Sequence, residues 1–368
     1  MTSRALAIAI AAMTFAGCST GDPAGSGPDT SSPDTSSLDA SSLDTASPDA
    51  TVDTSTGTTS TVPIDTTTDV PTTADATVTI DTSGPGTASD AGSTASAGSA
   101  RLDEAVEAAL DADGYGELLS SLHATIVDPT APTRARADAG ARFQLVLRSL
   151  ADRPELDDAV LAALRPSARP SVERIVRARE FLQARSASRP SPPPPTEVPA
   201  WTIIEPEPVP TLLGHYAEAE ARTGIPWYWL AAIHLQETRM GRIQGVSSAG
   251  AVGPMQFLPT TWEVCCEGDP TMTRDAIIGA ATYLAQSGGP DDMAAALYRY
   301  NPNDGYVAVV TAYAEALRDE PELYSGYHGF QVFYGTSAGT VRLPIGYAEP
   351  EPVDAASYLA ANPADAAS

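Results

Sequence analysis

One acidic side chain stands in a stripe of apolar residues that predicts a helix with one buried face. The stripe consists of Leu230, Ile233, Glu237 and Met240, which follow one another at spacings of three, four and three residues. Because removal from water disfavours the charged form of a carboxyl group, this position should raise the pKa of Glu237. A carboxyl that stays protonated near neutral pH can act as a general acid. The same residues leave a structural alternative open, in which Glu237 pairs with Arg239 or Arg242.

Three short motifs follow in order: Glu237-Thr238, Gly253-Pro-Met-Gln256 and Arg299-Tyr-Asn301. Together they resemble the lytic murein transglycosylases, goose-lysozyme-like enzymes that cleave the glycan of peptidoglycan, and most closely the membrane-bound B type. Pro254 stands where that family usually has Leu, and Arg299 where it usually has Ala. The resemblance covers about residues 201–347 and implies a lysozyme-like helical catalytic domain.

The resemblance implies a reaction that uses one carboxyl group twice. Glu237 would protonate the glycosidic oxygen between N-acetylmuramic acid and N-acetylglucosamine, and the substrate's acetamido group would stabilise the cationic centre. Glu237 would then deprotonate the C6 hydroxyl, which closes a 1,6-anhydro ring without water. A two-carboxylate glycosidase needs a second acid, but turn and capping roles explain the nearby candidates, Asp269, Asp275, Asp291 and Asp292. No cofactor and no metal is expected.

The resemblance also implies a set of substrate-binding residues. Gly250 and Gly253 lack a Cβ and would let the backbone approach a sugar closely, and an amide such as Gln256 can both donate and accept hydrogen bonds. The residues expected to bind substrate are Ser247, Met255, Gln256, Tyr300 and Asn301. His234, one turn before Glu237, is expected to be partly exposed.

Two other functions remain open. A lysozyme-like hydrolase would use the same Glu237 with water. A non-catalytic cell-wall-binding lipoprotein would use the fold only to hold glycan. Both share peptidoglycan strands as the expected partner.

The charge of the chain argues against nucleic acid as a partner. The 368 residues carry a formal net charge of −26, and an acidic surface repels phosphate. Twelve of the acidic residues are Asp within residues 19–100, a segment rich in Ser and Thr that has few large apolar side chains. Such a segment cannot offset its ordering entropy, which predicts a disordered tether.

The N-terminus predicts export and lipid attachment. Arg4 precedes a short apolar run that ends in Phe15-Ala-Gly-Cys18, which resembles the lipobox of bacterial lipoproteins. Residues 1–18 would then be the signal peptide, with Cys18 as the lipidated residue, and an ordinary secretory signal is the alternative. This predicts a protein of the cell envelope, anchored by lipid to the outer (periplasmic or extracellular) side of a bacterial membrane. No later run of about 20 apolar residues predicts a transmembrane helix.

The remaining chain predicts a mainly α protein with a small β-hairpin. Apolar stripes over 101–187 indicate a helical bundle, which could be a spacer or could bind an envelope protein. A Pro-rich linker is expected at 188–200, the catalytic domain at 201–350 and a loose tail at 351–368. Within the catalytic domain, helices are expected at 227–240, 260–264, 273–287, 291–300 and 304–317, the last four near a capping Thr, Asp or Asn, and the hairpin is expected at 330–343.

The three cysteines leave one question open. Apart from Cys18, the adjacent Cys265 and Cys266 could be two thiols or could form a strained vicinal disulfide. Adjacent cysteines alone do not make a metal site.

Overall fold

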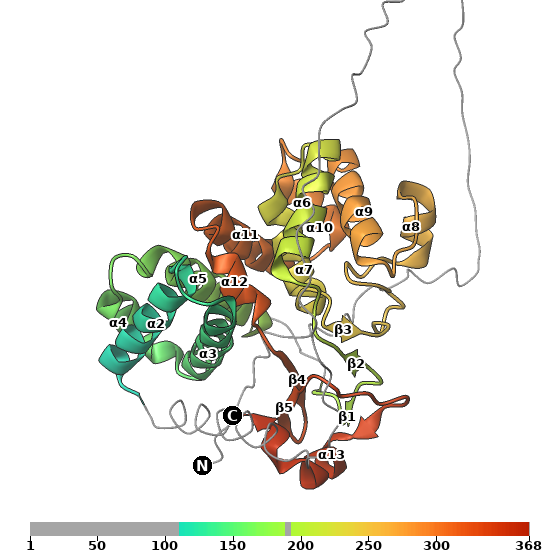
Figure 1. The fold of residues 1–368 in the computed structure, drawn as a ribbon. Helices are drawn as coiled ribbons and strands as arrows, with labels where there is room; N and C mark the ends of the chain where they lie inside the picture. Colours follow the sequence, from blue (N-terminus) through green and yellow to red (C-terminus); the bar gives the residue numbers. More distant parts are fainter. Residues whose placement is uncertain (1–109, 188–192, 368) are drawn as a thin grey trace, which may run out of the picture. The chain divides into compact units, whose positions relative to one another are not determined.

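The computed structural model describes residues 110–187 and 193–367, which fold into a mainly helical protein with a few short antiparallel strands (Figure 1). The predicted signal peptide, Cys18 and the predicted tether lie outside the described residues. None of the helices in the described part of the chain combines the length and the hydropathy that a membrane span requires.

Four helices precede α6 (Val209–Thr223) within the described residues, and the part of the expected bundle before residue 110 lies outside them. The four helices are α2 (Ala112–Val127), α3 (Thr133–Ala151), α4 (Asp157–Ala163) and α5 (Arg169–Ala187). A short 3-10 turn, Pro154–Leu156, joins α3 to α4. Asp111 caps α2 by accepting a hydrogen bond from the Gly114 amide at 2.8 Å.

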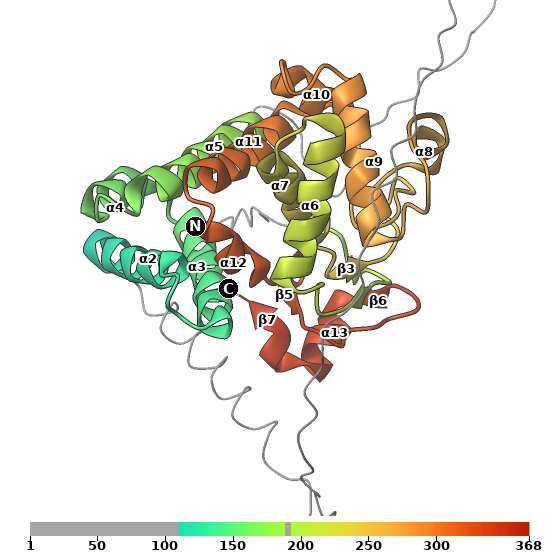
Figure 2. The ribbon, with the colours of Figure 1, turned by 45° about the horizontal axis from the view of Figure 1, so that its top comes forward.

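Seven helices build the region around Glu237 (Figure 2). They are α6 (Val209–Thr223), α7 (Trp227–Thr238), α8 (Pro259–Cys265), α9 (Thr273–Gln286), α10 (Met293–Tyr300), α11 (Asp304–Asp319) and α12 (Leu323–His328). The helices expected at 260–264, 273–287, 291–300 and 304–317 are therefore confirmed within a few residues. Gly224 ends α6 in a left-handed conformation with φ 76°, which glycine adopts readily, and Pro226 precedes α7.

The expected helix caps are only partly confirmed. The Asp292 carboxylate caps α10 by accepting from the Ala295 amide, and the Asn303 side chain accepts from two amides at the start of α11. By contrast, α8 and α9 begin after Leu258 and Met272, which make no side-chain cap. Pro259 explains the start of α8 without a cap, because proline favours the first helical turn.

Within the described residues, the strands form three small antiparallel sheets. The predicted hairpin is present as β4 (Val332–Thr336) and β5 (Gly339–Leu343), with Val332 opposite Leu343, and β7 (Ala366–Ala367) extends it. The other two sheets each pair short strands: β1 (Glu197–Val198) with β6 (Val353–Asp354), and β2 (Thr202–Ile203) with β3 (Ile243–Gln244).

Two expected irregular segments are ordered, and those predictions are wrong there. Part of the segment expected as a linker forms β1, and Val198 within it is fully buried. The expected loose tail contains β6, helix α13 (Ala355–Ala361) and β7. The reason is packing of a few apolar side chains: Tyr358 of α13 is buried against Tyr347 with ring centroids 5.7 Å apart.

Helix α3 packs closely on α12, so the first four helices share a hydrophobic core with the helices around Glu237. A Cβ added at Gly140 would lie 1.9 Å from the Gly326 carbonyl oxygen, which only direct backbone contact explains. The Gln144 side chain also donates to the Gln331 carbonyl at 3.0 Å and accepts from its amide at 2.7 Å. Together these contacts join the bundle to the start of the hairpin.

We expect Gly140→Ala to lower the free energy of unfolding by about 2 kcal/mol, because the added methyl group must displace backbone. Gly214→Ala is the matched control, since nothing lies within 4 Å of a Cβ at that exposed helical position. The control should gain about 0.5–1 kcal/mol from helix propensity. Urea denaturation measures both changes, and equal effects of the two substitutions would contradict the contact between α3 and α12.

Candidate active site

Glu237 lies in the last turn of α7, a helix buried on almost every side. The residues from Ala231 to Leu235 have no exposed surface, while the Glu237 side chain is partly exposed. The carboxyl lines a cleft at this end of the helix. The sequence-based prediction that Glu237 shares a face with buried Leu230 and Ile233 is consistent with this position.

The chain makes an unusual turn directly after Glu237. The helix expected to reach Met240 ends at Thr238, and the next three residues all have positive φ: Arg239 at 55°, Met240 at 62° and Gly241 at 84°. Such conformations cost free energy in residues other than glycine, so the surrounding contacts must hold them. The Thr238 hydroxyl does so by donating to the Pro254 carbonyl at 2.6 Å and accepting from the Gly241 amide at 3.0 Å.

The glycine-rich loop closes on itself beside this turn. Val252 and Phe257 form a two-residue bridge with hydrogen bonds in both directions, and Gln256 adopts a positive φ of 50°. A Cβ at Gly253 would lie 1.8 Å from the Pro270 carbonyl oxygen, whereas a Cβ at Gly250 would meet nothing within 4 Å. The expectation that Gly253 lets a sugar approach is thus wrong: its missing side chain makes room for the protein's own backbone.

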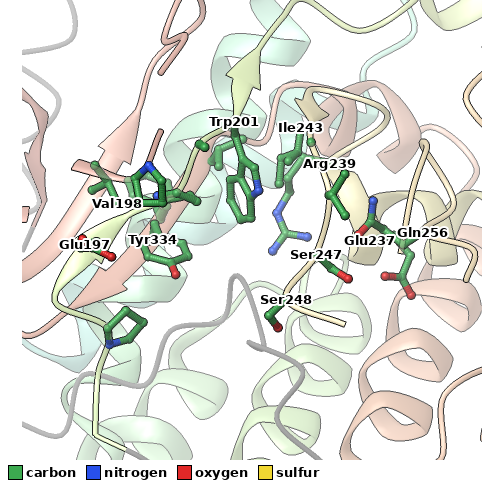
Figure 3. Close-up of a pocket in the computed structure, with 18 of the residues that line it drawn as sticks. Glu197, Val198, Trp201, Glu237, Arg239, Ile243, Ser247, Ser248, Gln256 and Tyr334 are labelled. Atoms are coloured by element: carbon green, nitrogen blue, oxygen red, sulfur yellow. The ribbon is translucent and has the colours of Figure 1, made fainter. Parts of the chain in front are cut away.

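Glu237 opens into an elongated cleft of about 710 Å³. Around Glu237 the cleft is lined by Gln236, Arg239, Ser247, Ser248, Gln256, Asn301 and Tyr306. Figure 3 shows Glu237, Gln256 and Ser247 near one end and Tyr334, Val198 and Glu197 toward the other, with Trp201 between them.

The surroundings of Glu237 raise its pKa to about 7. Desolvation is the largest cause, and Tyr306 and Arg239 act in the opposite direction by favouring the ionised form. The Tyr306 hydroxyl makes no hydrogen bond of regular geometry, but it lies close enough to Glu237 to interact with the carboxyl. The resulting pKa places Glu237 where a general acid works best near neutral pH.

The lining of the cleft contains one further acid, Glu197, which lies toward the opposite end from Glu237 (Figure 3). The other candidates have structural roles. Asp292 caps α10, the Asp269 carboxylate accepts from the amide and hydroxyl of Thr271, and Asp275 accepts from the Asp269 amide. Asp291 does not line the cleft.

The residues expected to bind substrate separate into two groups. Ser247, Gln256 and Asn301 line the cleft with Glu237. Met255 and Tyr300 do not: the Met255 side chain is fully buried in the core, and the Tyr300 hydroxyl donates to the Met255 carbonyl at 2.6 Å. Tyr300 therefore supports the loop that carries Gln256 instead of facing the cleft.

Sequence reasoning missed Tyr306, which lines the cleft with Glu237, whereas Tyr300 does not. The two rings are stacked, with centroids 6.4 Å apart and planes 5° from parallel. The nearest signal in the sequence is the Asn303 cap of α11, whose side chain accepts from the Tyr306 amide. That signal does not say which way the first turn faces.

Two further expectations are resolved. His234 is fully buried, not partly exposed, and its Nδ1 shares a hydrogen bond of 2.8 Å with the Tyr216 hydroxyl. Burial lowers the pKa of His234 to about 3, so it stays neutral.

Cys265 and Cys266 form a vicinal disulfide at the end of α8. Among the described residues, no group of three or more His, Cys, Asp or Glu could hold a metal ion.

Comparison with known proteins finds a similarity to a named enzyme. Over 128 residues the chain is 30% identical to a protein of Thiobacillus denitrificans named membrane-bound lytic murein transglycosylase F. The match covers 33% of this chain and 27% of that protein, so the chain spans about a quarter of the relative's length. No model of a known protein family and no solved structure matches the chain. The particular likeness to the B type stays a prediction.

The raised pKa of Glu237 predicts a pH-dependent change in stability. Between its usual value of 4.5 and about 7, the folded state holds a proton that the unfolded state releases, so this contribution to stability is lost as the pH rises through about 7. We expect the free energy of unfolding of Glu237→Gln, taken relative to that of the wild type, to increase by about 1–3 kcal/mol from pH 5 to pH 8. Urea denaturation at both pH values measures the gain. Glu263→Gln, at an exposed position on α8, should show none, and equal behaviour of the two variants would contradict the shift.

Proposed function

We propose that this protein is a lytic transglycosylase that cleaves the β-1,4 bond between N-acetylmuramic acid and N-acetylglucosamine in peptidoglycan. The observation that supports this most strongly is the Glu237 carboxyl, which has a raised pKa and lies in a cleft where the other acid is toward the opposite end. The partial likeness to a lytic murein transglycosylase supports the choice of substrate. The order of the three motifs in the sequence supports it as well.

In the first step Glu237 acts as an acid. The protonated carboxyl donates its proton to the glycosidic oxygen, the bond from that oxygen to C1 breaks, and the N-acetylglucosamine side leaves as an alcohol. The acetamido oxygen of the muramic acid residue shares the positive charge that develops at C1. Arg239 and Tyr306 stabilise the carboxylate that Glu237 becomes.

In the second step Glu237 acts as a base. Its carboxylate removes the proton from the C6 hydroxyl, and the C6 oxygen bonds to C1 to close the 1,6-anhydro ring. Glu237 ends protonated, ready for the next cycle, and no water is consumed. Because a single carboxyl serves both steps, the scheme needs no second acid at the reacting centre.

Ser247, Gln256 and Asn301 would hold the reacting sugars in place. All three line the cleft beside Glu237. The Gln256 amide nitrogen donates to the Gly253 carbonyl at 2.9 Å, which directs its side-chain oxygen as an acceptor for a sugar hydroxyl or amide. The Ser247 hydroxyl accepts from the Ala251 amide at 2.9 Å, so its proton is left to donate.

A hydrolase with the same Glu237 is the second candidate, and it requires a water molecule to reach C1. The partly exposed position of Glu237 supports that access. The two reactions give different products, because hydrolysis leaves a reducing muramic acid that is one water heavier than the anhydro form.

We expect the wild-type protein to release muropeptides that end in 1,6-anhydro-muramic acid, as measured by mass spectrometry. Glu237→Gln should lower the rate by about 100-fold or more, because it removes the acid and base. The wild-type rate should fall as the pH rises through about 7, where Glu237 loses its proton, and Glu263→Gln should match the wild type.

Products without the anhydro ring would favour the hydrolase. Equal release by the wild type and by Glu237→Gln would remove Glu237 from the chemistry and leave a protein that only binds cell wall.

We also propose that lipid attached to Cys18 anchors the protein in the cell envelope. A separate proposal is that the helical bundle of residues 101–187 binds an envelope protein. Both rest on the sequence. Incorporation of labelled fatty acid that persists in Cys18→Ala would contradict the anchor. Failure of the full-length protein to retain any envelope protein would weaken the second proposal.

A further inference from the structure

The end of the cleft toward Trp201 and Tyr334 has its own construction (Figure 3). Its walls come from residues 195–201, from Val332, Phe333 and Tyr334 of β4, and from Pro352. Residues 195–200 and Pro352 lie outside the segment whose motifs resemble transglycosylases. The three segments meet here because β1 pairs with β6 and the hairpin packs beside β1 in a second hydrophobic core.

Trp201 is the main apolar surface at this end, and it is held firmly. A Cβ at Gly245 would lie 2.3 Å from Cδ1 of Trp201, so the indole packs directly on that glycine. On another side the Trp201 and Tyr334 rings meet edge to face, with centroids 5.5 Å apart and planes at 84°. The Trp201 amide donates to Pro199 at 2.9 Å, and its carbonyl accepts from the Glu349 amide at 3.1 Å.

The indole nevertheless remains partly open to the cleft. Trp201 is partly exposed and lines the cleft. Its ring N–H has no partner among the described residues. A flat aromatic face with a hydrogen-bond donor at its rim suits a ligand that is apolar on one side and hydroxylated at its edge.

The β4 wall beside Trp201 is supported by contacts from the bundle. The Arg148 guanidinium of α3 lies over the Phe333 ring at 4.3 Å from its centroid. The hydrogen bonds between Gln144 and Gln331 fix the chain just before β4. The site is therefore preorganised and need not form on binding.

The charge at this end excludes one class of ligand. Arg239 is the one basic residue that lines the cleft, and it adjoins Glu237. The charged residue toward Trp201 and Tyr334 is Glu197. An anionic group such as a peptide carboxylate would meet no cation there, so the surface favours an uncharged ring.

We propose that Trp201 and Tyr334 form a subsite for an uncharged N-acetylhexosamine ring of the glycan strand, separate from the reacting centre at Glu237. The ring stacks on the Trp201 indole, and its hydroxyls meet the indole N–H and the Tyr334 hydroxyl. The choice of this polymer rests on the proposed function. The subsite holds the strand and takes no part in the chemistry.

The test measures binding of chitohexaose, an uncharged N-acetylglucosamine oligomer, to the Glu237→Gln protein by calorimetry. Adding Trp201→Ala should weaken binding about tenfold, because one stacked ring is lost. Trp201→Phe should lose less, since it keeps an aromatic face and the packing on Gly245. Tyr298→Ala, at an exposed aromatic outside the cleft, should bind as the parent does.

A second measurement guards against a folding defect in Trp201→Ala. In the Glu237→Gln protein with intact Trp201, the indole N–H resonance of Trp201 should shift on addition of chitohexaose and stay unchanged with a free stem peptide. Unchanged chitohexaose affinity in Trp201→Ala, or an indole resonance that responds only to the peptide, would overturn the subsite.

The outcomes separate the two proposals. If Glu237→Gln digests peptidoglycan as the wild type does but chitohexaose binding depends on Trp201, the proposed function fails and the subsite stands. If anhydro products form while Trp201 has no effect on binding, the proposed function stands and the subsite fails.

Discussion

The desolvated carboxyl of Glu237 is the interaction on which the rest of this site depends. A charged carboxylate at the end of a buried helix is costly, and the protein tolerates it by giving Glu237 a raised pKa and two stabilising neighbours, Tyr306 and Arg239. The position is fixed by the left-handed turn after Thr238, which ends α7 directly behind the carboxyl. The Thr238 hydroxyl joins that turn to the loop bearing Gln256. The same contacts therefore position both the Glu237 carboxyl and Gln256.

Much of this site could be predicted from the sequence because the signals are local. The stripe around Glu237 and the helices from α8 to α11 follow from spacing within a single element. Tyr306 could not be found in this way, because its approach to Glu237 depends on how α11 packs against α7. Met255 was assigned to the cleft from a motif, yet its side chain is in the core. A motif identifies a segment but does not say which of its side chains face the ligand.

The ordered C-terminal segment shows the same limit at the level of the fold. Residues after 350 are rich in Ala, Pro and acids, and few of them are large and apolar. They are ordered because β6 and β7 pair with strands distant in the sequence and because Tyr358 is buried against Tyr347. Likewise, the bundle was expected as a separate module, whereas α3 reaches the hairpin that walls the cleft. Such long-range pairing leaves little trace in local composition.

The most direct test of this account is a titration of the Glu237 carboxyl itself. Carbon-13 NMR of protein labelled at the glutamate side-chain carboxyl gives one titration curve per residue, and the signal absent from Glu237→Gln assigns Glu237. The account predicts a pKa of about 7 for this group. A value near the ordinary 4.5 would show that the carboxyl is solvated and ionised at neutral pH, and Glu237 could then not serve as the acid.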